Sequence, residues 1–207
     1  MRKITVIGIT GSIGMGKTTA ADMLREMGIP VHDSDASVHG LLGSAGKAVF
    51  LVGRKFPEAL KATESGEPYI DRQVLGRIVF SDRKKKRELE EILHPMVRAE
   101  SDAFVAEMIK KAHNIVALDI PLLFETGSER RVNVTICVTA PPSLQRDRVL
   151  ARAGMTSEKF ERIVGGQLSD AEKCKRADYI VETDKGFDEM RRQLEKIISQ
   201  IRDLQKA

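Results

Sequence analysis

Short apolar runs separated by helical patterns dominate the hydrophobic pattern of this chain. The runs are rich in β-branched and aliphatic side chains and fall at residues 3–9, 29–32, 115–119, 132–138 and 179–181. They lack strict alternation of polar and apolar positions, which is typical of parallel strands that are covered on both faces. Because helical patterns separate them, the connections are expected to be right-handed crossovers. The sequence therefore predicts an α/β fold with a five-stranded parallel sheet flanked by helices.

Helical spacing of apolar positions predicts three helices that flank this sheet, at residues 17–27, 141–152 and 187–204. Gly28 suits the left-handed position that commonly follows the end of a helix. The last helix carries an apolar stripe at the spacing expected for one buried face. Its members are Leu194, Ile197, Ile198 and Ile201.

Residues 36–113 form an interval too long for a single crossover, and we expect a helical insertion there. The predicted helices cover residues 38–56, 71–80, 83–93 and 95–111. Turn residues between Pro57 and Pro68 interrupt the insertion, and His94 with Pro95 is expected to end one helix before the next begins.

Residues 156–177 form a second distinctive interval, which is polar and rich in glycine and charge. This composition is typical of a mobile lid rather than of a buried core. We therefore predict a single domain whose core comprises residues 1–35, 114–155 and 178–207.

Composition and charge exclude several classes of function. Only 4% of the 207 residues are aromatic and none is Trp, which argues against a protein that stacks bases or sugars on aromatic platforms. The net charge is +4, but residues 130–176 alone carry +5 and the rest of the chain −1. The basic run at 84–87 is followed at once by acids, which indicates a solvated helix face. We therefore expect no nucleic acid as a partner. No stretch reaches the roughly 20 apolar residues of a membrane span, so we expect no membrane partner either.

The chain has two cysteines, Cys137 and Cys174, which are too few for a disulfide scaffold and form no C-x-x-C pair. Cys137 lies in an apolar run and is expected to be a small buried hydrophobe. This cysteine usage favours a reducing, cytoplasmic compartment.

Residues 11–18 read Gly-Ser-Ile-Gly-Met-Gly-Lys-Thr and fit the phosphate-binding pattern G-x-x-x-x-G-K-[ST]. A predicted strand precedes the loop and a predicted helix follows it, so its backbone N–H groups and the helix dipole favour phosphate binding. Lys17 is expected to reach the β- and γ-phosphates, and the Thr18 hydroxyl to help hold Mg²⁺. A glycine turn without a ligand is the disfavoured alternative. The expected nucleotide contacts are Gly11, Ile13, Gly14, Met15, Gly16, Lys17, Thr18 and Thr19.

Carboxylates follow the second and third apolar runs directly. Asp33 and Asp35 flank Ser34 after the second run, and Asp119 ends the third. Ligands of open α/β sheets bind beyond the carboxyl ends of the strands, so one of these carboxylates is a candidate to orient or deprotonate an attacking hydroxyl. Asp119 has the form of a Walker B carboxylate that supports Mg²⁺. The alternatives are an N-cap for Asp33 or Asp35 and a strand-end cap for Asp119.

Basic and amide side chains follow the fourth run, at Gln145, Arg146, Arg148, Arg152, Arg162 and Gln167. The i,i+4 spacing of Arg148 and Arg152 predicts that both point the same way from one helix. Arginines on a lid can close over phosphates and stabilise transferring charge. The alternative is a solvated helix face, which we prefer for Arg146.

Taken in order, these motifs resemble the dephospho-CoA kinase family, which catalyses the last step of coenzyme A synthesis. The resemblance runs nearly end to end, whereas the phosphate loop alone indicates only a nucleotide-binding protein. It is carried by residues 9–18, 33–35, 70–80, 93–95 and 121–125, by the Q-x-x-R-x-x-x-R…R-x-x-x-Q pattern between Gln145 and Gln167, and by Ala177-Asp178.

The resemblance implies transfer of the ATP γ-phosphoryl group to the ribose 3′-hydroxyl of dephospho-CoA, within a P-loop kinase core that carries a substrate-binding insertion (36–113) and a lid (156–177). It implies that Asp33 is the base or the orienter of the 3′-hydroxyl, that Lys17 and Arg148 stabilise phosphoryl charge, and that Arg148 and Arg152 contact ATP. The implied substrate contacts are Asp33, Asp35, Arg72, His94, Leu122, Arg162 and Gln167. ATP, Mg²⁺ and dephospho-CoA are the expected partners of a cytoplasmic monomer or weak homo-oligomer.

The chain departs from the family pattern at one position. The family carries Asn in an I-x-N-x-G run after the last strand, and this chain has Thr183 there. Two rival functions remain: a P-loop kinase with a nucleoside, nucleotide or shikimate-like acceptor, and a nucleotide-gated regulatory module such as a GTPase. The second lacks an N-K-x-D guanine signature after a strand, and a DNA-binding role lacks a helix with a basic face.

Overall fold

The computed structural model describes residues 4–80 and 82–206. The chain divides into two compact units. The first unit comprises the described residues up to His32 together with those from Met108 onward, and the second comprises Asp33–Glu107.

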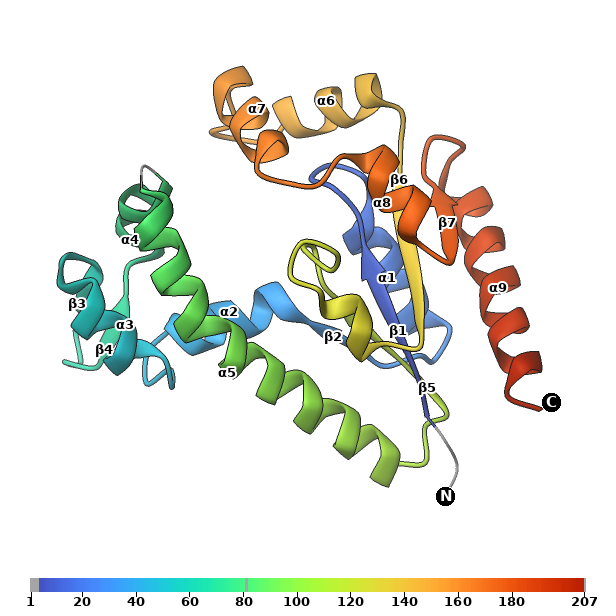
Figure 1. Ribbon diagram of the computed structural model, residues 1–207, viewed down its shortest axis with the longest axis horizontal. Coiled ribbons are helices and arrows are strands. Elements are labelled where there is room, and N and C mark those ends of the chain that lie inside the picture. The colour runs from blue at the N-terminus through green and yellow to red at the C-terminus, as the bar shows by residue number, and fades with distance from the viewer. Residues whose placement is uncertain (1–3, 81, 207) are drawn as a thin grey trace. The chain divides into compact units, whose positions relative to one another are not determined.

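The first unit is built on a sheet of five strands within the described residues (Figure 1), which confirms the predicted α/β sheet. Strand β1 pairs in parallel with β5 and β6, and β6 pairs in parallel with β7. The predicted apolar runs match the observed strands to within two residues at each end. In spatial order the strands are β2 (Val31–Asp33), β5 (Ile115–Asp119), β1 (Thr5–Thr10), β6 (Val134–Thr139) and β7 (Tyr179–Glu182).

Helices α1 (Lys17–Glu26) and α9 (Phe187–Leu204) lie side by side against this sheet (Figure 1). Their apolar stripes pack with Ile136 and Val138 of β6 in one buried cluster, which confirms the predicted stripe of α9. Since side chains alternate along a strand, Cys137 points to the opposite face of β6. That face meets α8 (Asp170–Arg176), which follows α6 (Pro142–Leu150) and α7 (Ser157–Gly165) in the chain.

Gly28 follows α1 with a φ of 78°, as predicted for the residue after a helix end. A short 3₁₀ turn, η2 (Ser128–Arg131), precedes β6. Among the described residues, none of the helices is both long enough and apolar enough to cross a membrane.

The second unit is mostly helical, and its core gathers apolar side chains of each of its longer helices. An antiparallel pair of short strands lies where the sequence predicts only turns. In chain order its elements are α2 (Ser34–Leu42), α3 (Val49–Lys55), η1 (Pro57–Ala59), β3 (Leu60–Ala62), β4 (Pro68–Ile70), α4 (Arg72–Phe80) and α5 (Arg83–Lys110), the last of which ends in the first unit.

The single helix predicted at 38–56 is wrong, because the chain breaks between α2 and α3. Gly43 is extended, with φ −71° and ψ −177°, and Ala45 has a positive φ of 57°. At Gly46 the backbone passes so close to α2 that a Cβ would lie 2.3 Å from the carbonyl oxygen of Leu41. These three residues turn the chain so that α3 packs back into the core of the unit.

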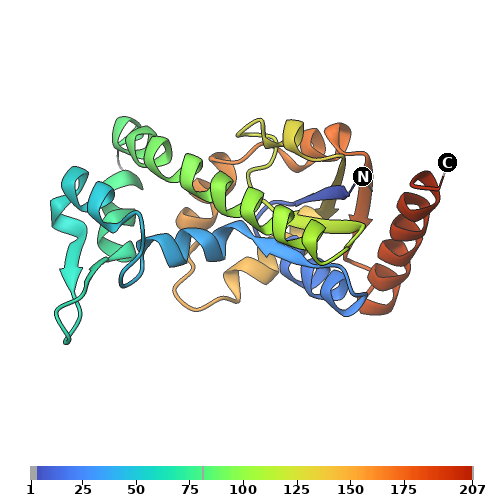
Figure 2. The same ribbon diagram turned by 90° about the horizontal axis from the view of Figure 1, so that it is seen from below.

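The two helices predicted at 83–93 and 95–111 are also one element, since α5 runs without interruption through Pro95 (Figure 2). A proline inside a helix removes one backbone hydrogen bond and costs about 3 kcal/mol. Around it, Leu93, Met96 and Val97 pack into the core of the second unit, which offsets that loss. The expected helix boundary at His94 is therefore absent.

Candidate active site

The phosphate-binding loop connects β1 to α1 in the first unit, as predicted. Gly16 forms the N-cap of α1 in a left-handed conformation, and the first turn of α1 holds no acidic residue. The positive end of the helix dipole is therefore left for an anionic ligand. Met15 is buried, and its Sδ accepts a hydrogen bond from the backbone N–H of Ala140 at 3.1 Å, which fixes the loop against the chain after β6.

Gly14 is the position where the loop most needs a glycine. Its φ is 80°, and an added Cβ would lie 2.5 Å from Cγ2 of Val149 and 3.0 Å from the carbonyl oxygen of Gln145. Val149 is fully buried and β-branched, so it has little freedom to move away.

We expect Gly14→Ala to lower the free energy of unfolding by roughly 2–4 kcal/mol, through backbone strain and overpacking together. Gly28→Ala is the matched control, since Gly28 has a similar φ of 78° with open space around it, and strain alone costs about 1–2 kcal/mol there. Urea unfolding of both variants measures the difference. Equal losses would show that the loop does not pack closely against α6.

Lys17 and Asp119 form an ion pair at the carboxyl ends of β1 and β5. Lys17 Nζ donates to Oδ1 of Asp119, and the two side chains are 14% and 5% exposed. β1 and β5 are neighbours in register, with Ile9 beside Asp119, so the strand pairing brings these two charges together. The carboxylate thus holds the lysine at the mouth of the phosphate loop.

Thr183 follows β7 and joins this segment to the phosphate loop and to α6. Its hydroxyl donates to the carbonyl oxygen of Met15 at 2.9 Å and accepts from Nη1 of Arg148 at 2.7 Å. Nη2 of Arg148 donates to the carbonyl oxygen of Thr183, also at 2.7 Å. The residue at which this chain departs from the family pattern therefore fixes Arg148 beside the phosphate loop.

Two glutamines hold Ile13 of the loop from both sides. Nε2 of Gln145 donates to the carbonyl oxygen of Ile13 at 2.8 Å, and the N–H of Ile13 donates to Oε1 of Gln167 at 3.1 Å. Gln145 is buried on α6, whereas Gln167 follows α7 in the predicted lid. A backbone donor expected to bind phosphate is therefore paired with a lid side chain.

Lys173 anchors the end of the lid and is fully buried on α8. Its Nζ lies 2.9 Å from Oε1 of Glu125 and 2.9 Å from the carbonyl oxygen of Pro121. Glu125 also accepts a hydrogen bond from the N–H of Leu168 at 2.8 Å. Lys173 is one of the basic residues of the segment 130–176, and in the structure it is a buried cation with a structural role.

Asp33 begins α2 in the second unit, at the end of β2. Its Oδ1 accepts from the N–H groups of Asp35 and Ala36 at 2.9 and 3.0 Å, which is the N-cap arrangement considered for it. Both bonds use the same oxygen, so within the described residues Oδ2 is not engaged by the cap. Asp35 is exposed on the first turn of the helix.

Arg72 and His94 are the other predicted substrate contacts of the second unit. Arg72 is exposed on α4, and its Nη1 lies 2.5 Å from Nδ1 of His39 on α2. His94 is half-buried in the middle of α5, where burial is the main cause that lowers its pKa. The imidazole of His94 is therefore neutral at pH 7.

Arg148 and Arg152 do not share one helix face, and this expectation from their spacing is wrong. Helix α6 ends at Leu150, and Arg152 lies in the bend that follows, exposed to solvent. The N–H of Arg152 bonds to the carbonyl oxygen of Val149 in a turn three residues apart, so the α-helical repeat does not reach Arg152.

The remaining predicted residues occupy varied environments. Arg162 is exposed on α7, and Leu122 is half-buried in the turn after β5. Thr18 is exposed in the first turn of α1, whereas Thr19 is half-buried. Arg146 is exposed, which agrees with the solvated helix face expected for it. Its guanidinium lies over the ring of Phe160, 5.6 Å from the ring centroid.

Comparison with known proteins places these features in one family. The dephospho-CoA kinase family profile matches residues 5–189. Dephospho-CoA kinase of Mesorhizobium japonicum is 46% identical over 197 residues, covering 95% of this chain and 96% of its own. The enzyme of Brucella melitensis is 46% identical over 194 residues, covering 94% of each chain.

Solved structures agree with the sequence comparison. A protein from Thermus thermophilus has a TM-score of 0.81 at 35% identity, covering 96% of this chain and 97% of its own. Dephospho-CoA kinase from Campylobacter jejuni has a TM-score of 0.69 at 26% identity, covering 95% and 96%. A shikimate kinase from Bacteroides thetaiotaomicron shares the fold alone, at 14% identity and a TM-score of 0.50 over 96% of this chain and 98% of its own. With its phosphate loop intact and the family profile matched over most of its length, this chain belongs to the dephospho-CoA kinase family.

Proposed function

We propose that this protein transfers the γ-phosphoryl group of ATP to the ribose 3′-hydroxyl of dephospho-CoA, giving coenzyme A and ADP. The observation that carries the proposal is the match of the family profile over residues 5–189, which includes the complete phosphate-binding loop. The fold supports it, because that loop lies between β1 and α1, where the positive end of the helix dipole favours an anion.

The loop is proposed to bind the phosphates of ATP through its backbone N–H groups. The N–H of Ile13 is paired with Gln167, so a phosphate oxygen that accepts this N–H replaces the Gln167 side chain. Release of Gln167 then leaves the segment after α7 free to rearrange around the nucleotide. In this proposal ATP binding and the position of the lid are coupled through one backbone donor.

Asp33 is proposed as the base that orients the 3′-hydroxyl and accepts its proton. It ends β2, a strand of the sheet whose β1 leads into the phosphate loop. The cap bonds to Asp35 and Ala36 hold Oδ1 in place, so that Oδ2 is the oxygen for the hydroxyl. Ligands of open α/β sheets bind beyond the carboxyl ends of strands, which is where Asp33 lies.

Lys17 and Arg148 are proposed to stabilise the charge of the transferring phosphoryl group, since preorganised cations are the main catalytic elements of such transfers. Lys17 exchanges Asp119 for phosphate, and Arg148 keeps its backbone bond to Thr183 while its charge faces the loop. Arg152 and Arg162 are exposed and are proposed to reach ATP and substrate when the lid closes.

The residues of the loop fit Mg²⁺, which prefers hard oxygen ligands. The Thr18 hydroxyl is exposed at the start of α1, and Asp119 supplies a carboxylate after β5. These two side chains would hold the ion or its waters. When bound, Mg²⁺ neutralises charge on the phosphates and so assists their transfer.

The predicted contacts of the acceptor remain proposals. Asp35, Arg72, His94 and Leu122 are proposed to contact dephospho-CoA. A neutral His94 suits a hydrogen bond to substrate rather than a charge contact with its phosphates. A cytoplasmic location and a monomeric or weakly self-associating state also remain predictions from the sequence.

Thr183→Val tests the positioning of Arg148, because valine has nearly the same shape but no hydroxyl. We expect a loss of about 1–3 kcal/mol in the free energy of unfolding, since the carbonyl oxygen of Met15 loses its donor. We also expect kcat to fall roughly tenfold, which corresponds to about 1.4 kcal/mol. Thr183→Ser keeps the hydroxyl and should retain most of both quantities. If valine and serine behave alike, the hydroxyl does not position Arg148.

A coupled assay of ADP release tests the proposed reaction against its rivals. Purified protein with ATP and Mg²⁺ is assayed without an acceptor and with dephospho-CoA, shikimate, gluconate or AMP. We expect ADP release above the acceptor-free rate only with dephospho-CoA. A higher rate with another acceptor would assign the protein to a different kinase activity, and slow hydrolysis of GTP without any acceptor would favour the regulatory module.

A further inference from the structure

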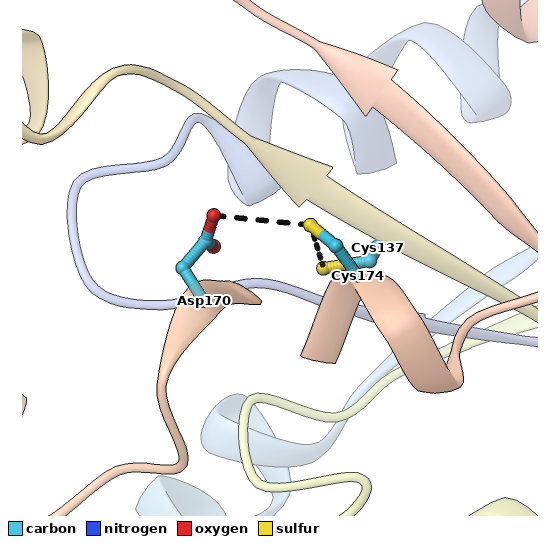
Figure 3. Close-up of side chains that lie close together, drawn as sticks. All are labelled: Cys137, Asp170 and Cys174. Atoms are coloured by element: carbon cyan, nitrogen blue, oxygen red, sulfur yellow. Dashed lines mark hydrogen bonds between the residues drawn. The ribbon is translucent and has the colours of Figure 1, made fainter. Parts of the chain in front are cut away.

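A second group of chemically reactive side chains lies where α8 packs on β6. Figure 3 shows Cys137 of β6 converging with Cys174 and Asp170 of α8. The two Sγ atoms are 3.8 Å apart, and Sγ of Cys174 lies 3.8 Å from Oδ2 of Asp170. All three ligand atoms lie within 4.8 Å of one another.

Two of these separations are close to the edges of a tetrahedral metal site. With Zn–S bonds of about 2.3 Å, two thiolates of a tetrahedral site are roughly 3.8 Å apart. With a Zn–O bond of about 2.0 Å, a thiolate and a carboxylate oxygen are roughly 3.5 Å apart. The first value equals the distance between the two sulfurs, and the second is within a few tenths of an ångström of that between sulfur and carboxylate.

The carboxylate of Asp170 is also incompletely bonded. Its Oδ2 accepts from the Thr139 hydroxyl, but its Oδ1 is buried and has no hydrogen-bond partner within the described residues. A buried carboxylate oxygen without a partner costs about 1–3 kcal/mol. A bound cation is one group that removes this cost.

We propose that Cys137, Cys174 and Asp170 form a binding site for a thiophilic divalent cation of the Zn²⁺ class. Two thiolates and one carboxylate supply three ligands, and a water molecule completes the tetrahedron from the side where Cys174 and Asp170 reach solvent. The bound ion ties α8, at the end of the lid, to strand β6. The site is distinct from that of Mg²⁺, which takes oxygen ligands.

A disulfide between the two cysteines is the main alternative use of this geometry. Both cysteines are free in the structure. Burial is the main cause that raises the pKa of the Cys137 thiol, and it also raises that of Cys174. Thiol–disulfide exchange needs a thiolate, so these thiols are slow to exchange, whereas a divalent cation deprotonates the thiols that coordinate it and releases their two protons to solvent. A disulfide also brings no positive charge to the Asp170 carboxylate, whereas a bound cation does.

The test uses the full chain, reduced and freed of metal by a chelator that is then removed. Co²⁺ is added as a probe, because its thiolate complexes give a charge-transfer band that reports the sulfur ligands, and Zn²⁺ is then added as a competitor. We expect one Co²⁺ per chain with this band, its displacement by Zn²⁺, and a higher unfolding temperature with either metal.

Variants separate this site from metal binding elsewhere on the chain. Cys174→Ala is preferred to replacement of the fully buried Cys137, which has a greater risk of misfolding. It should remove the band, and Asp170→Asn should weaken Co²⁺ binding at least about tenfold. Glu172→Gln, on the same helix but outside the cluster, should bind as the unaltered chain does. Absence of the band, its persistence in Cys174→Ala, or loss of both thiols to a disulfide in the presence of Co²⁺ would overturn the proposal.

Discussion

Asp33→Asn is expected to lower kcat by roughly 10²- to 10⁴-fold while changing the Kd for ATP by less than about threefold. The carboxylate accepts the proton of the attacking hydroxyl, and an amide cannot. Asparagine retains an oxygen at the Oδ1 position and is as good an N-cap as aspartate, so the bonds to Asp35 and Ala36 persist and α2 still begins at the same residue. Steady-state kinetics and calorimetric titration with ATP measure the two quantities.

Asp82→Asn is the matched control for this substitution. Asp82 also accepts bonds from two backbone N–H groups, those of Lys84 and Lys85, at the start of α5. The same chemical change at a cap outside the proposed site should leave kcat within about twofold of its original value. If Asp33→Asn lowers kcat and ATP affinity equally, or lowers neither, Asp33 is not the base.

Lys17→Met is expected to lower kcat/KM for ATP by roughly 10²- to 10³-fold, the usual effect of removing one charge-stabilising group. Methionine preserves the unbranched stem of the side chain, so the change isolates the charge. Lys185→Met is the matched control, because Lys185 is an exposed lysine whose ion pair with Glu182 lies on the surface. The control should keep kcat/KM within about twofold.

The ion pair with Asp119 complicates the interpretation of Lys17→Met, and a double variant resolves it. Removing Lys17 alone leaves the buried Asp119 carboxylate without this cation, which destabilises the fold as well as the site. Lys17→Met combined with Asp119→Asn removes both charges and should recover much of the lost unfolding free energy, but not the lost activity. If activity returns with stability, Lys17 has a structural role only.

The sheet and the helices that pack on it could be predicted from sequence because their signals are local. Continuous apolar runs mark the strands, and the stripe of α9 repeats at helical spacing along its whole length. The two wrong predictions in the second unit, a break that was missed and a break that is absent, depend on packing instead. Pro95 normally ends a helix, yet the apolar neighbours of Pro95 hold α5 together, whereas Gly46 breaks a helical pattern through a backbone contact with Leu41.

The residues of the candidate site also fall into two groups: those with a local sequence signal, and those whose contacts depend on the fold. The loop sequence identifies Lys17 and the glycines, because that motif has one dominant use. The sequence gives no indication of the buried state of Lys173, since its neighbours on α8 are charged and its partners Glu125 and Pro121 are distant in the chain. The hydrogen bonds of Thr183 to Met15 and Arg148 likewise join segments that only the fold brings together. The departure from the family pattern indicated Thr183 as a position of interest, but it did not predict which residues Thr183 contacts.

The most direct test of the central claim follows the phosphate itself. The protein is incubated with dephospho-CoA, Mg²⁺ and ATP labelled in the γ-phosphate, and the products are separated and analysed by phosphorus NMR. We predict that the label appears in coenzyme A, as a monoester on the ribose 3′-oxygen, with one ADP formed for each labelled product. Label in inorganic phosphate alone, or on another position of the acceptor, would contradict the account.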